Sequence, residues 1–83
     1  MHQYYYGQDK KSNLIIMPIQ AVLFPKHFTI HDMRRFLREH KLHAMKPPHE
    51  TARFKRVRIL EPNFKSYSTT KLPSGVDLVI GYD

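Results

Sequence analysis

The most apolar run of the chain is LIIMPIQAVLF, residues 14–24, which is uncharged and rich in branched and aromatic side chains. A run of this kind is typical of a strand that is buried on both faces or lies in the middle of a sheet. Pro18 has no N–H to donate to a neighbouring strand, so it favours the start of a strand or an edge position. We therefore expect this strand at about residues 19–24.

A helical pattern follows in residues 25–43, PKHFTIHDMRRFLREHKLH. Thr29 is a favourable N-cap, and Asp32 three positions later fits a capping box with Asp in the place of Glu. One face of the helix is apolar, because five of its residues fall within an arc of about 120° at 100° per residue. These five are Ile30, Met33, Phe36, Leu37 and His40. A basic edge runs beside this face and consists of Arg34, Arg38 and Lys41.

The segment RFKRVRIL, residues 53–60, alternates as a strand does, but neither of its faces is wholly apolar. Val57 and Ile59 indicate the side that faces the core, since alternate residues of a strand share a face. Arg56 and Arg58 then point away from the helix, onto the uncovered face of the sheet. The sequence therefore predicts cationic side chains on that open face.

Near the end of the chain, the segments STTKL and VDLVIGY flank the tripeptide PSG. A three-residue connector that ends in Gly predicts a β-hairpin. Gly81 favours a bulge or a close approach of backbone. With the earlier elements, this gives the order β-α-β-β-β and an α+β class. We expect a two-layer sandwich with one amphipathic helix on a mostly antiparallel sheet of three or four strands.

Residues 1–12, MHQYYYGQDKKS, show no apolar periodicity. We expect a flexible Tyr-rich N-terminal arm that becomes ordered only against a partner, followed by a single small domain over residues 13–83. Tyr4, Tyr5 and Tyr6 are candidates for stacking on bases or for filling a partner's pocket. The alternative is a disordered tail with no such role.

Composition and charge narrow the possible classes of protein. The chain has no cysteine, which excludes disulfides, thiolate zinc sites and thiol catalysis. Residues 34–71 carry eleven basic and three acidic side chains, so this block holds a net charge of +8 in a chain of net charge +7. Such a block favours nucleic acid as a partner, then an acidic protein or a membrane surface, whereas the alternative is a solvated basic face.

Targeting signals are also weak. The apolar run of residues 14–24 falls short of the roughly 20 residues that span a bilayer, and no signal peptide is visible. We therefore expect no membrane span and a soluble protein that is intracellular or carried inside a particle, rather than a secreted one.

Patterns for metal binding and catalysis carry little weight. His27 and His31 are four residues apart and His40 and His43 are three apart, spacings that can share a metal ion on a helix. However, His27 precedes the expected helix and His43 follows it, so we predict no metal and no cofactor. His49 and Glu50 are the pair best suited to a nuclease, as base and metal ligand, and a small nuclease remains an alternative.

Nucleic-acid binding has the strongest physical basis. Guanidinium groups grip phosphates, and aromatic faces stack on bases. The predicted nucleic-acid-binding residues are Arg34, Arg38, Lys41, Arg53, Lys55, Arg56, Arg58 and Lys65, and the predicted stacking residues are Phe54, Tyr67, Tyr4, Tyr5 and Tyr6. No recognised base-reading motif is present, so we expect salt-dependent contacts to the backbone of DNA or RNA. For each aromatic residue, a place in the core is the alternative.

Four segments of the chain form a recognisable series: QAVLFPKHFT (20–29), MRRFLREHKL (33–42), RFKRVRILEP (53–62) and TTKLPSGVDLVIGY (69–82). Together they resemble a family of short, functionally uncharacterised proteins of phages and large DNA viruses. Members of the family look like a strand, a Pro-Lys turn, a helix ending in His, an Arg-x-Arg strand and a C-terminal LVxGY hairpin. The Arg-x-Arg pair falls on Arg56 and Arg58. The resemblance covers roughly residues 18–82 and implies a viral or phage setting, without any catalytic residue. With the lack of targeting signals, it implies a location in the host cytoplasm or nucleus, or inside a virion.

Two non-enzymatic hypotheses follow. The first is a small basic accessory protein of a virus or phage that binds nucleic acid through its phosphate backbone. The alternative is a minor virion component or protein–protein interaction module, whose arm and open sheet face dock on larger viral proteins. The two differ in salt dependence, because phosphate contacts weaken steeply with salt and an apolar interface does not.

Overall fold

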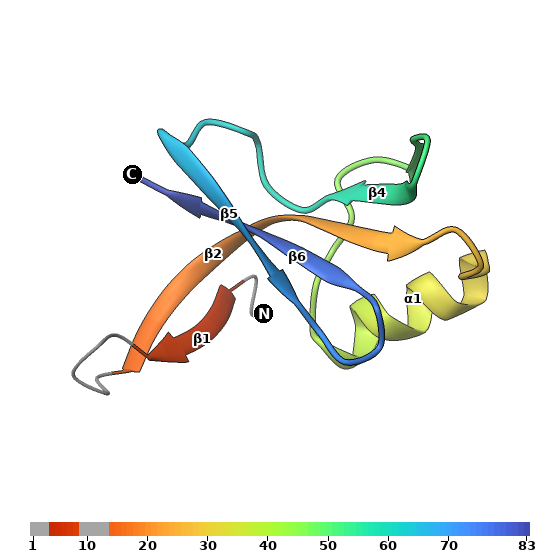
Figure 1. Ribbon diagram of the computed structural model, residues 1–83, viewed down its shortest axis with the longest axis horizontal. Coiled ribbons are helices and arrows are strands. Elements are labelled where there is room, and N and C mark those ends of the chain that lie inside the picture. Colours follow the sequence, from red (N-terminus) through yellow and green to blue (C-terminus); the bar gives the residue numbers. More distant parts are fainter. Residues whose placement is uncertain (1–3, 9–13) are drawn as a thin grey trace.

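The computed structural model describes residues 4–8 and 14–83, with side-chain detail from Met17 onward, and it has an α+β fold (Figure 1). Within these residues, one helix and six strands are present. In chain order they are β1 (Tyr4–Gln8), β2 (Leu14–Pro25), α1 (Ile30–Glu39), β3 (His49–Glu50), β4 (Phe54–Arg58), β5 (Ser66–Lys71) and β6 (Asp77–Tyr82). The predicted class and the predicted order of the helix among the longer strands are confirmed.

All strand pairs are antiparallel, and β2 lies at the centre of the sheet order β3-β4-β2-β6-β5. The first half of β2, from Leu14 to Pro18, pairs instead with β1. The prediction of three or four strands was therefore too low, because β1 and the two-residue β3 were not anticipated. β3 has only two residues, both polar, and β1 (YYYGQ) has no alternation of apolar and polar residues, so each is defined by the strand beside it.

The segment 4–8, which was expected to belong to a flexible arm, is paired with β2 in the structure. Residues 1–3 and 9–13 lie outside the described residues, and so do the side chains of Tyr4, Tyr5 and Tyr6. The flexibility of the arm and its stacking role therefore stay predictions.

Strand β2 begins earlier than the predicted residue 19, at Leu14, and runs through Pro18. Proline is tolerated there because Pro18 is the last partner of β1, while the pairing with β6 starts at Ile19. Its missing N–H thus falls where one ladder ends and the next begins.

The helix follows the local signals in the sequence. Thr29 is the N-cap: its hydroxyl accepts a hydrogen bond from the Asp32 N–H at 3.1 Å, and the Asp32 carboxylate accepts one from the Thr29 N–H at 2.9 Å. This reciprocal pair is the predicted capping box. At the other end, His40 is exposed, but its ring stacks on Phe36 with centroids 4.0 Å apart.

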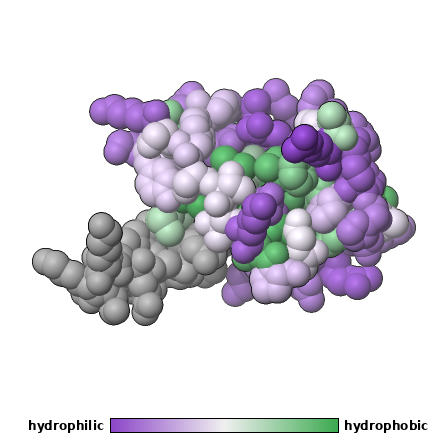
Figure 2. Space-filling view, viewed as in Figure 1, coloured by the Kyte–Doolittle hydropathy of each residue, from purple (hydrophilic) through white to green (hydrophobic). Residues whose placement is uncertain are grey.

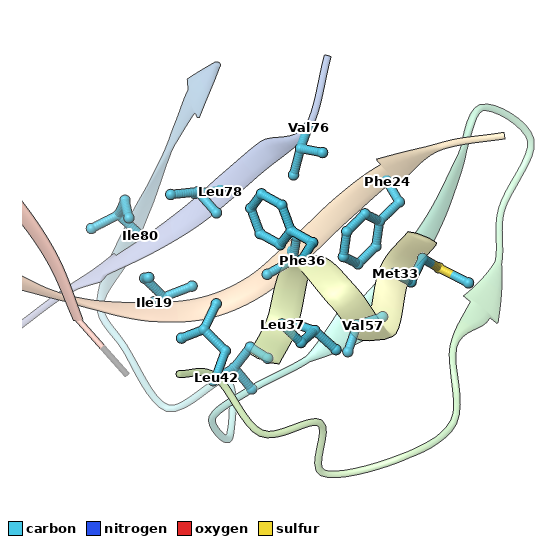
Figure 3. Packing of buried hydrophobic residues seen from close by; sticks show 12 residues of the cluster. Ile19, Phe24, Met33, Phe36, Leu37, Leu42, Val57, Val76, Leu78 and Ile80 are labelled. Carbon is cyan, nitrogen blue, oxygen red and sulfur yellow. The ribbon is translucent and has the colours of Figure 1, made fainter. Parts of the chain in front are cut away.

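The core lies between α1 and the sheet (Figure 3). Met33, Phe36 and Leu37 of α1 are buried against side chains of β2, β4 and β6 and of the segments next to them. These partners are Ile19, Val22, Phe24, Leu42, Val57, Ile59, Val76, Leu78 and Ile80. The prediction that Val57 and Ile59 face the core is confirmed. Ile30 was expected on the apolar face, yet it stays 40% exposed because it lies in the first turn of the helix.

Strands β5 and β6 form the predicted hairpin, in register from Ser66 opposite Tyr82 to Lys71 opposite Asp77. Its turn is closed by hydrogen bonds between Gly75 N–H and Leu72 O, 3.0 Å, and between Leu72 N–H and Val76 O, 2.9 Å. Gly75 has a φ of +89°, a conformation that glycine adopts at little cost. At Gly81 the close approach is made by a side chain rather than by backbone, because the ring of Phe64 lies over it.

Candidate nucleic-acid interface

Arg56 and Arg58 project from β4 on the side opposite to the buried Val57, as the alternation predicts. Both side chains are half-buried. The Nη1 atom of Arg58 lies 3.7 Å from the Glu61 carboxylate, but both groups are solvated, with side chains 33% and 54% exposed. Exposed ion pairs of this kind are weak, so Arg58 stays available to a stronger anion.

Arg56 is held by Gln20, a residue that the sequence did not single out. Gln20 is fully buried at a bulge of β2, between Ile19 and Ala21. Its Oε1 accepts a hydrogen bond from Arg56 Nη2 at 3.1 Å, while its Nε2 donates to Leu60 O at 3.0 Å. A polar residue in an otherwise apolar run was the only signal of this role. This hydrogen bond orients the Arg56 guanidinium in the absence of a ligand.

A first basic hollow, here called the sheet hollow, has a volume of about 550 Å³. It is lined by Lys46, Pro47, Pro48, His49, Arg56 and Arg58. His49 is brought there because it pairs with Arg56 in register, and the preceding segment is tied to the outer edge of β4 by the bond from Met45 N–H to Arg58 O at 2.9 Å. Lys46 and His49 were not predicted as binding residues, since their placement depends on this loop.

A second basic hollow, here called the helix hollow, has a volume of about 450 Å³. It is lined by Arg34, Leu37, Arg38, Lys41, Leu42 and His43. The structure thus brings together the three cations of the predicted basic edge. Arg34 and Arg38 are one turn apart on α1, and Lys41 follows the end of the helix.

The backbone at Lys41 is strained, which makes its position informative. Its φ is +55°, the left-handed region that normally takes glycine after a helix. Hydrogen bonds from Leu42 N–H to Leu37 O, 2.8 Å, and from Lys41 N–H to Arg38 O, 3.1 Å, complete a Schellman motif. A non-glycine residue in this conformation costs about 1 kcal/mol. Here a cation occupies the place where glycine would be more stable.

The other predicted cations lie outside both hollows. Lys55 points to the helix side of β4, where its Nζ donates to Phe28 O at 2.6 Å. Arg53 is exposed in the connection between β3 and β4. Lys65 is exposed just before β5, and its backbone N–H bonds Tyr82 O at 2.9 Å. The structure therefore does not gather these three residues with the others.

The predicted stacking residues are less accessible than expected. Phe54 is half-buried at the start of β4, opposite Pro25. Tyr67 is 42% exposed, but its ring meets the edge of Phe64 and its hydroxyl accepts a hydrogen bond from the Phe64 N–H at 3.3 Å. Phe64 covers Gly81, but it is not among the residues of the hydrophobic core.

The pair His49 and Glu50, considered for a nuclease, diverges in the structure. Successive residues of a strand point to opposite faces, so His49 joins the sheet hollow while Glu50 forms an ion pair with Lys26. This hydrogen bond with Lys26 lowers the pKa of the Glu50 carboxyl below its ordinary value. Within residues 4–8 and 14–83, no group of three His, Cys, Asp or Glu side chains is arranged to hold a metal ion.

On the face drawn in Figure 2, hydrophobic residues gather towards the middle and hydrophilic residues form most of the rim.

Among the helices of the described part of the chain, none is long and apolar enough to cross a membrane. Comparisons with protein-family models, with curated proteins and with solved structures find no match. The resemblance to short phage and viral proteins therefore stays a prediction. A function is proposed below from the residues of the two hollows.

Proposed function

We propose that this protein binds nucleic acid through phosphate contacts at the sheet hollow and the helix hollow. The observation that carries the proposal is the composition of the two linings. They contain six Lys or Arg side chains and two histidines, and among the described residues no Asp or Glu lines either hollow. The six are Arg34, Arg38, Lys41, Lys46, Arg56 and Arg58.

The chemistry of these cations suits phosphate. A guanidinium group presents a planar fork of donors that can bind two phosphate oxygens at once. Arg56 is already oriented by Gln20, so less side-chain entropy is lost when it binds a ligand. In this proposal the protein is a two-layer sandwich, with α1 on one face of the sheet and the cations of β4 on the other. It acts as an accessory protein of a phage or virus.

Salt dependence gives the first quantitative test. If all six cations contact phosphates, the logarithm of the binding constant should fall with the logarithm of salt concentration with a slope of about −4 for a single strand or about −5 for a duplex. Fluorescence anisotropy with a labelled oligonucleotide, measured at several salt concentrations from about 50 mM upward, gives this slope. The series starts at about 50 mM because binding is tight at low salt. A slope near zero would contradict the proposal.

A charge-matched pair of double variants separates the site from general attraction. Arg56→Ala with Arg58→Ala removes two cations of the sheet hollow, whereas Arg53→Ala with Lys65→Ala removes two exposed cations outside both hollows. The first variant should lose at least tenfold in affinity and reduce the slope by about 2, while the second should lose much less. Thermal unfolding of both variants checks that the fold is intact. Equal losses would show that only net charge matters.

The interaction-module hypothesis is supported by one feature, the edge strand β5. Among the described strands, β5 pairs with β6 alone, and most of its residues are exposed. Unpaired backbone groups on such an edge can accept a strand from another protein. A complex formed in this way should persist at a salt concentration that abolishes nucleic-acid binding, which distinguishes the two functions.

A further inference from the structure

A third hollow lies between the sheet hollow and the helix hollow. It has a volume of about 420 Å³ and lies between α1 and the segment of residues 44–48. Its apolar lining includes Ile30, Met45, Pro47 and Pro48, and we call it the apolar groove. Ile30 is 40% and Met45 is 46% exposed, so two large apolar side chains face solvent inside a strongly basic region. Neither side chain belongs to the hydrophobic core cluster.

The apolar groove is continuous with both basic hollows. It shares Arg34 and Leu37 with the helix hollow, and it shares Lys46, Pro47 and Pro48 with the sheet hollow. The three hollows therefore form one track whose ends are cationic and whose middle is apolar. Arg34 and Lys46 stand at the two junctions.

The track bends where it passes from the apolar groove to the sheet hollow. The residues from Lys46 to Pro48 line both hollows, so they form a ridge between them. The groove contains Val57, from the helix side of β4, whereas the sheet hollow contains Arg56 and Arg58, from the opposite side. The hydrogen bond from Met45 N–H to Arg58 O holds the start of this ridge to the edge of β4. A ligand that fills the whole track must turn around that edge.

We propose that the nucleic acid bound here is single-stranded, with phosphates at the two basic hollows and bases against the apolar groove. This inference rests on the proposed function and specifies its substrate class. A duplex keeps its bases stacked inside and is stiff over about 150 base pairs, so it can neither turn around the sheet edge nor offer base faces to Ile30 and Met45. A single strand can do both, because its bases are free to lie on apolar or aromatic side chains while its backbone follows a basic path.

The charge pattern favours this ligand over an acidic peptide. In a single strand, every unit carries both a phosphate and a flat apolar base face. The track offers cations on each side of an apolar middle, and no carboxylate lines any of its three hollows among the described residues. The two prolines also make the ridge rigid, because their φ angles are fixed.

The test compares a labelled single strand of about 12 nucleotides, a length within the range of small single-strand sites, with the duplex of the same sequence. DNA and RNA versions form separate arms, and all are measured by anisotropy at the same moderate salt concentration. The expected result is at least tenfold tighter binding of one or both single strands. Duplex binding that is equal or tighter would overturn the inference but leave the proposed function standing. No binding of any nucleic acid would overturn both.

Variants of the groove make the test specific. Met45→Gln and Ile30→Gln replace exposed apolar groups without changing charge, and Met45→Leu is the matched control that keeps an apolar surface. Each Gln variant should lose about fivefold in single-strand affinity, the low end of the roughly 5- to 150-fold range that removal of one aromatic base-stacking contact gives, because Met and Ile are aliphatic. Duplex binding by the Gln variants and single-strand binding by Met45→Leu should change little. Equal loss for both nucleic acids, or no loss, would contradict the role of the groove. Displacement of the oligonucleotide by poly-glutamate at equal charge would favour the acidic peptide instead.

Discussion

Gln20 and Arg56 are joined by a hydrogen bond of 3.1 Å between Oε1 of the buried amide and Nη2 of the guanidinium. The two residues are 36 positions apart, on β2 and β4. Gln20 is in turn fixed by Leu60, whose carbonyl accepts from its Nε2 and whose N–H donates to its backbone oxygen, each at 3.0 Å. A buried bulge thus couples the centre of the sheet to a side chain of the sheet hollow.

This coupling predicts that Gln20→Met destabilises the protein and weakens nucleic-acid binding together. Met has a similar volume but leaves the Leu60 carbonyl without its amide donor, and an unsatisfied buried group costs about 1–3 kcal/mol. Urea denaturation should show this loss, and anisotropy should show weaker binding because Arg56 is no longer held. If stability falls while affinity measured well below the unfolding transition is unchanged, Gln20 supports the sheet but does not position Arg56.

Gly81 and Phe64 make a second prediction. A Cβ atom at position 81 would lie 2.4 Å from the Phe64 ring, so Gly81→Ala forces that ring to move. Overpacking of this kind costs about 1–3 kcal/mol. In a Phe64→Ala background the same Gly81→Ala change should cost almost nothing, because the clashing ring is gone. A double-mutant cycle by chemical denaturation measures the difference, and additive effects would contradict this contact.

The sequence predicted those parts of the fold that short-range chemistry decides. The capping box of Thr29 and Asp32 and the hairpin turn at Gly75 each depend on a few neighbouring residues, and both formed as expected. By contrast, β3 consists of two polar residues whose pairing depends on β4. Its existence is a tertiary effect that no local pattern carries.

The candidate site was predicted only in part, for the same reason. The helix hollow follows from the helical spacing of Arg34 and Arg38, so its cations were foreseen together. In the sheet hollow, Lys46 and His49 lie in or beside a loop whose path is set by long-range backbone bonds. Lys55 was predicted as a binding residue because of its charge. Its ammonium group instead donates to the Phe28 carbonyl and does not reach the open face of the sheet.

The capping box also predicts how stability responds to acid. The hydrogen bond from the Thr29 N–H, followed by that of the Thr29 side chain, lowers the pKa of the Asp32 carboxyl below its ordinary value of 3.8. A carboxyl with a lowered pKa in the folded state stabilises the protein fully above its unfolded pKa, and this contribution is lost as pH falls through the folded pKa. Melting temperatures should therefore fall less on acidification below pH of about 4 in Asp32→Ala than in the unmodified protein. Parallel pH profiles for the two proteins would contradict this role of Asp32.

Lys41 offers a test in which stability and binding should change in opposite directions. Glycine adopts the positive φ of this position without a steric penalty, so Lys41→Gly should stabilise the protein by up to about 1 kcal/mol. The same change removes a cation from the helix hollow, so nucleic-acid affinity should fall and the salt slope should decrease by about 1. Lys41→Ala is the matched control, because it loses the charge and keeps the strain. If Lys41→Gly binds nucleic acid as tightly as the unmodified protein, the helix hollow does not contact phosphate, and the strained lysine has another cause.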